Sequence, residues 1–157
     1  MKTKTMKKVL IALDYNPTAK KVAEAGYAMA KAMNADIFLL HVGLGLGMYS
    51  TVYPDMSGWQ IDSVDLIDEY DNANKASHIF LEKAKKQLAD ASVQTMQKEG
   101  DTAQMILEAA HEIKADCIVM GSHSQKWLEN ILLGSVTKEV LQKTSIPMFI
   151  VPTKKID

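Results

Sequence analysis

The residues best suited to chemistry frame a loop in the last third of the chain. A short apolar run, 117–120, stops at Gly121, and a second glycine, Gly134, stands directly before Ser135, where a helical pattern begins. A glycine at the end of a strand lets a phosphate approach the main chain, because any Cβ would intrude. The Ser135 hydroxyl can cap the helix, and the N–H groups beside it can hold phosphate oxygens. The pattern therefore predicts a phosphate-binding site between a strand end and a helix start.

Composition restricts the classes of protein to which the chain can belong. It has 157 residues, of which 47% are apolar and 24% charged, and this balance suits one globular domain over residues 1–157. The formal net charge of -1 gives no broad attraction to nucleic acid or to an anionic membrane. The basic leader, residues 1–6, precedes an apolar run too short for a signal peptide, and no segment is long enough for a membrane span, so we expect a cytoplasmic protein. The single cysteine, Cys117, lies in an apolar run and is expected to be a buried small hydrophobe.

Alternating strand and helix patterns predict an α/β fold. Runs that are apolar on both faces indicate buried strands at 9–13, 37–42 and 117–120, and weaker, edge-type strands are expected at 92–97 and 146–152. Helices are expected after an Asn16 cap with Pro17 at the first helical position and a stop at Asn34, over 62–89, after an Asp101 cap with Gln104, and over 135–143. In the 62–89 helix, Leu81 and Leu88 lie on one apolar stripe, and His78 falls on the same side. This order describes a five-stranded doubly wound parallel sheet with helices on both faces.

The least regular segment is the loop 43–60, which carries Gly43, Gly45 and Gly47. A dinucleotide fingerprint needs its glycines in the turn that opens a helix after the first strand, whereas these follow the second strand, so that interpretation is not favoured. A loop of this length is usually functional, and we expect a lid or a partner contact. An acidic cluster early in the 62–89 helix could be imagined as a cation site. Favourable charge at a helix N-terminus and a solvated face explain it with less effort.

The glycine spacing resembles the nucleotide-binding signature of the universal stress protein family, G-x2-G-x9-G-[S/T]. Gly121, Gly134 and Ser135 match that signature, and the nine-residue spacer is kept. Ser124 stands where the ATP-binding branch of the family carries its second glycine. The whole chain matches the family in element order and length, apart from the leader 1–6.

The resemblance implies the strand order 3-2-1-4-5 and a homodimer in which the last strand pairs with its mate across a two-fold axis. The proline-bounded edge strand 146–152 suits such pairing. In that order the reversal falls between the first and fourth strands, whose carboxyl ends face one crevice. The resemblance places Asp14 at the nucleoside end and the main chain of Val42 against adenine. The implied nucleotide-binding residues are Asp14, Val42, Met120, Gly121, His123, Ser124, Gly134, Ser135 and Val136.

The change at Ser124 leaves two outcomes open. If the backbone there needs positive φ, a serine costs roughly 1 kcal/mol of strain, and its Cβ would meet the triphosphate. If the backbone there is ordinary, the hydroxyl could instead add a hydrogen bond to a phosphate. His123 beside it is expected to make a loose contact at most.

No catalytic motif accompanies the predicted site. His41, His78 and His111 do not fall at metal-ligand spacings, and neither a G-x-S-x-G elbow nor a P-loop lysine is present. We therefore expect a binding module rather than an efficient enzyme: a homodimeric stress-response protein that binds ATP, with Mg²⁺ bridging the phosphates. Two alternatives stay open, a dimeric interaction scaffold that has lost nucleotide binding and a slow ATPase or autokinase on the same site.

Overall fold

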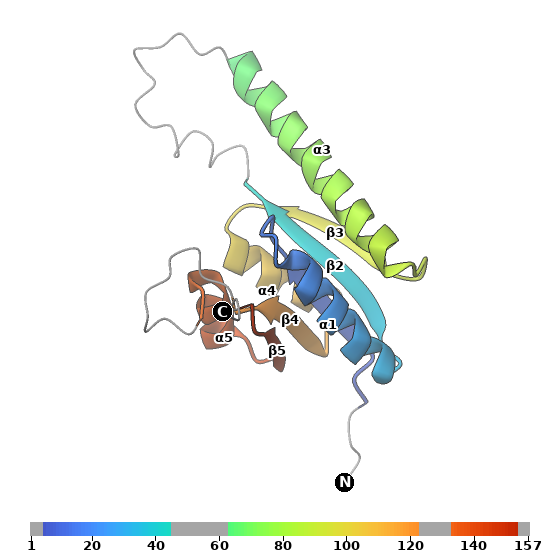
Figure 1. Ribbon diagram of the computed structural model, residues 1–157. Helices are drawn as coiled ribbons and strands as arrows, with labels where there is room; N and C mark the ends of the chain where they lie inside the picture. The colour runs from blue at the N-terminus through green and yellow to red at the C-terminus, as the bar shows by residue number, and fades with distance from the viewer. Residues whose placement is uncertain (1–4, 45–62, 123–132, 154–157) are drawn as a thin grey trace, which may run out of the picture.

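The computed structural model describes residues 5–44, 63–122 and 133–153, with side chains in the longest helix described from Asp71 onward. Strands and helices alternate along the chain (Figure 1). The strands are β1 (Lys8–Leu13), β2 (Asp36–Gly43), β3 (Gln94–Glu99), β4 (Cys117–Gly121) and β5 (Met148–Val151). The helices are α1 (Ala19–Ala32), α3 (Ser63–Leu88), α4 (Thr102–Glu112) and α5 (Ser135–Lys143). The predicted alternation is confirmed over the described part of the chain.

The five strands form one sheet in the order β3-β2-β1-β4-β5, and every pairing is parallel. β1 is central, since it pairs with β2 from Lys8 to Leu13 and with β4 over Val9–Ile11. β3 and β5 are the edges, as the polar pattern of the one and the prolines around the other predicted. The fold class and the implied strand order are both confirmed.

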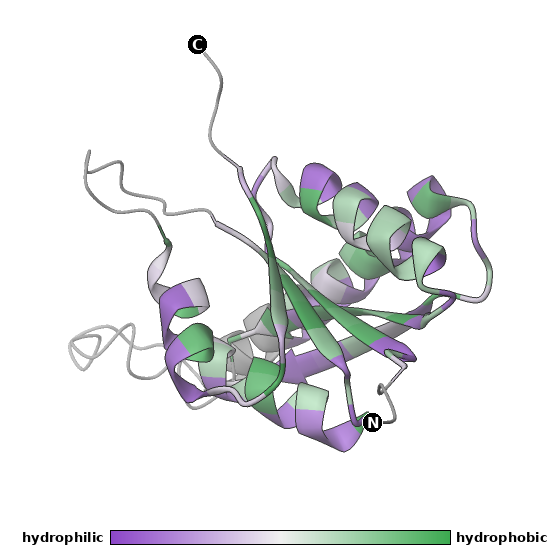
Figure 2. Cartoon of the chain, turned by 90° about the horizontal axis from the view of Figure 1, so that it is seen from below, coloured by the Kyte–Doolittle hydropathy of each residue, from purple (hydrophilic) through white to green (hydrophobic). Residues whose placement is uncertain are grey.

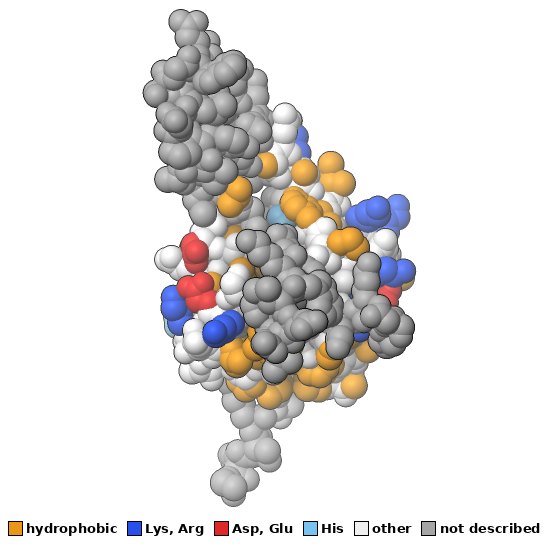
Figure 3. Space-filling view, turned by 60° about the vertical axis from the view of Figure 1, so that its left-hand side comes forward, with side chains coloured by type: hydrophobic (Ala, Val, Ile, Leu, Met, Phe, Trp, Pro, Cys, Tyr) orange, Lys and Arg blue, Asp and Glu red, His pale blue; other side chains and the backbone are white. Residues whose placement is uncertain are grey.

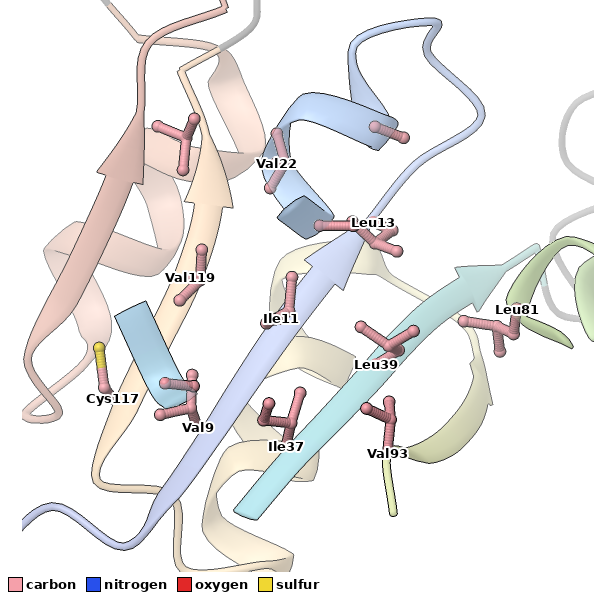
Figure 4. Packing of buried hydrophobic residues seen from close by; sticks show 14 residues of the cluster. Val9, Ile11, Leu13, Val22, Ile37, Leu39, Leu81, Val93, Cys117 and Val119 are labelled. Carbon is pink, nitrogen blue, oxygen red and sulfur yellow. The ribbon is translucent and has the colours of Figure 1, made fainter. Parts of the chain in front are cut away.

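Side chains alternate across the sheet and build a core on each face. One core joins the sheet to α1 and α3 and includes Val9, Ile11, Leu39, Leu81 and Val119 (Figure 4). The other joins the sheet to α4 and α5 and includes Leu10, Leu40, Ile106, Ile118 and Val140. In Figure 2 the largely apolar central strands lie between helices that carry both hydrophilic and hydrophobic residues. Burial on both faces explains why the central strands are continuous apolar runs in the sequence.

The start of α1 differs from the prediction. Asn16 was expected to cap the helix, but α1 begins at Ala19 and its N-cap residue is Thr18. The Asn16 Oδ1 accepts hydrogen bonds from the Thr18 N–H at 3.0 Å and the Thr18 hydroxyl at 2.8 Å. Asparagine thus closes a turn two residues ahead of the helix instead of capping the helix itself. The predicted stop is confirmed, because Asn34 lies just past the helix with a left-handed φ of 55°.

The buried face of α3 also differs from the prediction. His78 was placed on the same side as Leu81, yet it is exposed, whereas Ser77 is only 2% exposed. A buried serine interrupts the apolar stripe, so the periodicity of apolar residues alone misplaced the face. β3 begins at Gln94, two residues later than predicted, and the apolar Val93 is buried just before it.

Other expectations have mixed outcomes. Asp101 caps α4 by accepting a hydrogen bond from the Gln104 N–H at 2.9 Å, as predicted. Cys117 is buried, as predicted, and burial raises the pKa of its thiol. Met6, from the predicted leader, packs partly buried against the α1 core.

The loop predicted at 43–60 lies outside the described residues beyond Leu44. None of the described helices is both long and apolar enough to cross a membrane.

Candidate functional site

The strand order reverses at β1 and β4, and the candidate site lies at the carboxyl ends of these two strands. The chain leaves β1 towards α1 and β2 on one side, and leaves β4 towards α5 and β5 on the other (Figure 1). Connections that run apart in this way leave a crevice at the strand ends, where ligands of doubly wound proteins bind. Asp14 directly follows β1, and Gly121 ends β4. Both predicted residues therefore lie at adjacent strand ends.

Asp14 has an exposed carboxylate held by its own turn. Its Oδ1 accepts a hydrogen bond from the Asn16 N–H at 3.0 Å. A short hydrogen-bonded turn of this kind orients the side chain without burying it. The carboxylate therefore faces solvent at the end of the central strand, where it can accept hydrogen bonds from a ligand.

Hydrogen bonds join the two ends of the predicted phosphate loop. The Gly134 N–H donates to the Ser122 carbonyl at 3.1 Å, and the Ser122 N–H donates to the Val151 carbonyl at 2.9 Å. The exit from β4 thus contacts both the start of α5 and the neighbouring strand β5. The predicted convergence is confirmed for these ends, while His123 and Ser124 lie outside the described residues.

The first residues of α5 offer main-chain donors. The N-cap residue is Gly134, and Ser135 is the first helical residue, so the prediction that the Ser135 hydroxyl caps the helix is wrong. The first N–H groups of a helix have no acceptor within the helix. No hydrogen bond between described residues takes up those of Ser135 and Val136. A helix start with free donors attracts anions.

Positive φ does not account for the glycines at this site. Among the described glycines, only Gly100 has a left-handed backbone, with φ of 130°. Gly134 has φ of -62° and ψ of 157°, an extended conformation open to any residue. That the missing Cβ of Gly121 and Gly134 lets a ligand approach the main chain stays a prediction.

Three hydroxyl side chains that were not predicted support the loop ends. The Thr137 hydroxyl donates to the Gly121 carbonyl at 2.9 Å. The Ser122 hydroxyl accepts from the Thr153 N–H at 3.0 Å and shares a 3.3 Å hydrogen bond with the Thr153 hydroxyl. Thr137 and Thr153 are 4% and 7% exposed, so these side chains serve the interior of the protein. Their only sequence signal is a polar residue among apolar neighbours just beyond a strand or inside a first helical turn.

The other predicted residues serve the core with their side chains. Met120 is 6% exposed and belongs to the α4 and α5 core. Val42 and Val136 are partly buried against the same core. Val42 lies in β2 opposite Lys98 of β3. Because these side chains pack on the core, a contact through the main chain, the role predicted for Val42, suits them best.

An aromatic cluster lies beside the Asp14 turn and was not predicted. His41, 4% exposed, has its Nδ1 2.5 Å from the Ser77 hydroxyl oxygen. Its ring centroid lies 4.3 Å from that of Tyr15 and 5.5 Å from that of Phe80. Burial lowers the pKa of His41, and the charge of Asp14 opposes that shift. The cluster connects the turn after β1 to β2 and α3, and so supports the β1 end of the crevice.

The surface charges fit a small anionic ligand better than a polyanion. On the face shown in Figure 3, lysine and acidic side chains lie in small separate groups among hydrophobic ones. Within residues 5–44, 63–122 and 133–153, no group of three or more His, Cys, Asp or Glu side chains could hold a metal ion. The donors that the described start of α5 offers to an anion are main-chain N–H groups.

The fold and the crevice define a doubly wound α/β protein with a ligand site at the ends of its central strands. Sequence comparison narrows the class. The model of the universal stress protein family matches residues 5–152. Universal stress protein YxiE of Bacillus subtilis (strain 168) is 32% identical over 147 residues, which cover 92% of this chain and 97% of that protein. The chain belongs to the universal stress protein family.

Solved structures share the fold over almost the whole chain. A universal stress protein in complex with cAMP aligns with a TM-score of 0.61 at 18% identity, covering 96% of this chain and 100% of that one. The universal stress protein from Archaeoglobus fulgidus in complex with dAMP aligns with a TM-score of 0.59 at 18% identity, covering 94% and 98%. At these identities the likeness concerns the fold.

Proposed function

We propose that this protein is a stress-response module that binds an adenine nucleotide, ATP, at the crevice between β1 and β4 and acts as a homodimer. The observation that carries the proposal is the 3.1 Å hydrogen bond from the Gly134 N–H to the Ser122 carbonyl, which brings the start of α5 to the end of β4. The cAMP and dAMP complexes of two proteins with this fold support an adenine nucleotide as the ligand.

Each part of the crevice has a proposed role. The N–H groups of Ser135 and Val136, with the main chain at Gly121, hold phosphate oxygens. The Asp14 carboxylate accepts hydrogen bonds at the nucleoside end, and the Val42 main chain contacts adenine. For His123 and Ser124, contact with the phosphates stays a prediction. Mg²⁺ would be bound by the phosphates themselves and would offset their charge, since the described residues supply no metal site of their own.

Thermal melts with and without Mg-ATP test the proposal, together with mass analysis of any ligand released from freshly purified protein. ATP at 100 times its Kd stabilises a single site by about 2.7 kcal/mol. For a chain of this size that corresponds to a rise in Tm of roughly 5 to 10 °C. Adenosine and GTP at the same concentrations separate the contributions of the phosphates and of the base. No rise at millimolar ATP would leave the dimeric scaffold as the better account.

Asp14 is tested by Asp14→Asn, which keeps the oxygen that accepts from Asn16 but removes the charge. A hydrogen bond to a charged group contributes about 1.5 kcal/mol or more, so affinity for adenosine and ATP should fall by roughly tenfold or more. Asp36→Asn is the matched control, because Asp36 is an exposed carboxylate at the start of β2, the opposite end of the sheet. Equal affinities in both variants would remove Asp14 from the site.

Ser124→Gly tests the departure from the family signature. If the serine Cβ obstructs the triphosphate, the variant binds ATP more tightly, which isothermal calorimetry would detect. An unchanged affinity would discard that account of Ser124.

The homodimer is proposed through the free edge of β5. The carbonyls of Pro147 and Val151 accept from β4, so the main-chain groups of the alternate residues, Met148 and Ile150, point to the open edge. The Phe149 side chain is 39% exposed on the same strand. These features suit pairing with a second copy by edge addition.

Phe149→Lys tests this interface. Across a two-fold axis the same residue of each copy comes close, so two lysines would repel each other and the variant should sediment as a monomer. Ile79→Lys is the control, because Ile79 is 65% exposed on α3 beside the opposite edge of the sheet. Wild-type protein that sediments as a monomer at every concentration would refute the homodimer.

A further inference from the structure

Thr137 is the described residue whose side chain contacts the main chain of the predicted phosphate-binding glycine. Its hydroxyl donates to the Gly121 carbonyl at 2.9 Å, although the two residues lie 16 positions apart. Thr137 is 4% exposed and the hydrogen bond is partly buried, so water competes less for the hydroxyl than it would at the surface. The contact therefore fixes one peptide group at the point where the chain leaves β4.

The position of Thr137 in α5 determines what this hydrogen bond does. Thr137 is three residues past the N-cap Gly134, in the first turn of the helix. Its contact places the Gly121 carbonyl beside the turn whose N–H groups lack acceptors in the helix. A carbonyl oxygen is attracted to such donors for the same reason as a phosphate oxygen.

Without a partner of its own, the Gly121 carbonyl would compete with an anion. A partly buried acceptor without a partner is costly, and the N–H groups of Ser135 and Val136 have no acceptor among the described residues. A tilt of the Gly121–Ser122 peptide, whose N–H is bonded to the Val151 carbonyl, would bring the Gly121 oxygen towards them and place a partial negative charge where a phosphate is expected. The neighbouring Ser122 groups do not fill this need, because its N–H donates to Val151 and its carbonyl accepts from Gly134.

We propose that Thr137 is a positioning residue for phosphate binding: by donating to the Gly121 carbonyl, its hydroxyl keeps that carbonyl off the N–H groups of Ser135 and Val136 and leaves them to the phosphates. This inference rests on the proposed nucleotide-binding function and deepens it. The inference predicts different effects on the two parts of the ligand, because Thr137 affects binding of the phosphates and not binding of the nucleoside.

The test compares ATP, adenosine and pyrophosphate binding by calorimetry in wild-type protein and in Thr137→Val, which keeps the side-chain shape and loses the hydroxyl. ATP and pyrophosphate affinity should fall by roughly tenfold, while adenosine affinity stays at the wild-type value. Thr137→Ser, which keeps the hydroxyl, should retain wild-type affinity for all three. Thr95→Val makes the same chemical change on the edge strand β3 and should alter none of them.

The outcomes separate this inference from the function on which it rests. If wild-type protein binds none of the three ligands, the proposed function and the inference fall together. If wild-type protein binds ATP and Thr137→Val loses ATP and adenosine affinity equally, or loses neither, the nucleotide site stands and the positioning role is overturned. Should Thr137→Val not fold, Thr137→Ala against Thr137→Ser repeats the comparison with smaller side chains, and equal ATP affinity in those two variants would also overturn it.

Discussion

A methyl group added at Gly26 tests how closely α1 packs against β1 and β4, the two strands whose ends form the crevice. Gly26 is buried in α1, and a Cβ there would lie 2.9 Å from Ile11 Cδ1, 3.1 Å from Ile11 Cγ1 and 3.0 Å from Val119 Cγ1. Carbon atoms at optimal separation lie about 3.5 to 4.0 Å apart, so both side chains would have to move by roughly half an ångström or more. Ile11 and Val119 are completely buried and have little room to do so.

Two opposing effects determine how Gly26→Ala changes the free energy of unfolding. Alanine in place of glycine within a helix gains about 1 kcal/mol. Overpacking a closely packed core costs about 1 to 3 kcal/mol. We therefore expect a net loss of about 1 kcal/mol in the free energy of unfolding, which lowers Tm by roughly 2 to 4 °C in a chain of this length.

Urea unfolding of matched variants measures the two effects separately. Ala28→Gly, at an exposed position of the same helix, measures the propensity alone and should cost about 1 kcal/mol. Ile11→Val removes Cδ1, the atom nearest the new methyl, and should destabilise wild-type protein by about 1 kcal/mol but Gly26→Ala by much less. If Gly26→Ala instead stabilises the protein by as much as Ala28→Gly destabilises it, α1 has room to spare and the reasoning is wrong.

Three further predictions concern stability. Burial holds the pKa of His41 below its ordinary 6.5, so in acid the unfolded chain takes up a proton that the folded protein excludes. The free energy of unfolding should therefore fall as the pH drops below 6.5, and urea unfolding at several pH values should show a weaker fall in His41→Gln. Leu81→Ala should cost about 2 to 5 kcal/mol, while Ile79→Ala should be nearly neutral in the same assay, because Leu81 is 1% exposed and Ile79 is 65% exposed. Hydrogen bonds from Ser92 and Tyr27 hold the pKa of Asp90 below its ordinary 3.8, so the protein loses stability as the pH falls through the acid range. Melting curves should show a smaller drop in Tm over that range for Asp90→Asn than for wild-type protein.

The central strands could be predicted from the sequence because covering both faces of a sheet requires unbroken apolar runs. The edge positions of β3 and β5 followed from polar residues in the one and prolines around the other. Boundaries that depend on a single side chain were predicted less well. Asn16 closes a turn instead of capping α1, and Ser77 takes the buried position that the apolar pattern gave to its neighbour, His78. In both cases a polar side chain makes a hydrogen bond that the periodicity of apolar residues does not predict.

At the candidate site, too, some features could be predicted from the sequence and others could not. The spacing of Gly121, Gly134 and Ser135 predicted a phosphate loop and the family, because such a loop needs small residues and free main-chain donors at set positions. The spacing could not show that Gly134 rather than Ser135 begins the helix. In the structure the Gly134 carbonyl accepts from the Lys138 N–H, and the Gly134 N–H donates to the distant Ser122.

The sequence by itself determined the fold class, the order of the elements and the loop that ends at α5, because these follow from local periodicity and from short motifs. Only the tertiary structure decided which side chains support that loop. The bond of Thr137 to Gly121 spans 16 positions, and the contact of His41 with Ser77 spans 36. Such pairs form when the parallel strands bring their carboxyl ends together, and no local pattern records which polar groups will then face one another across the interior.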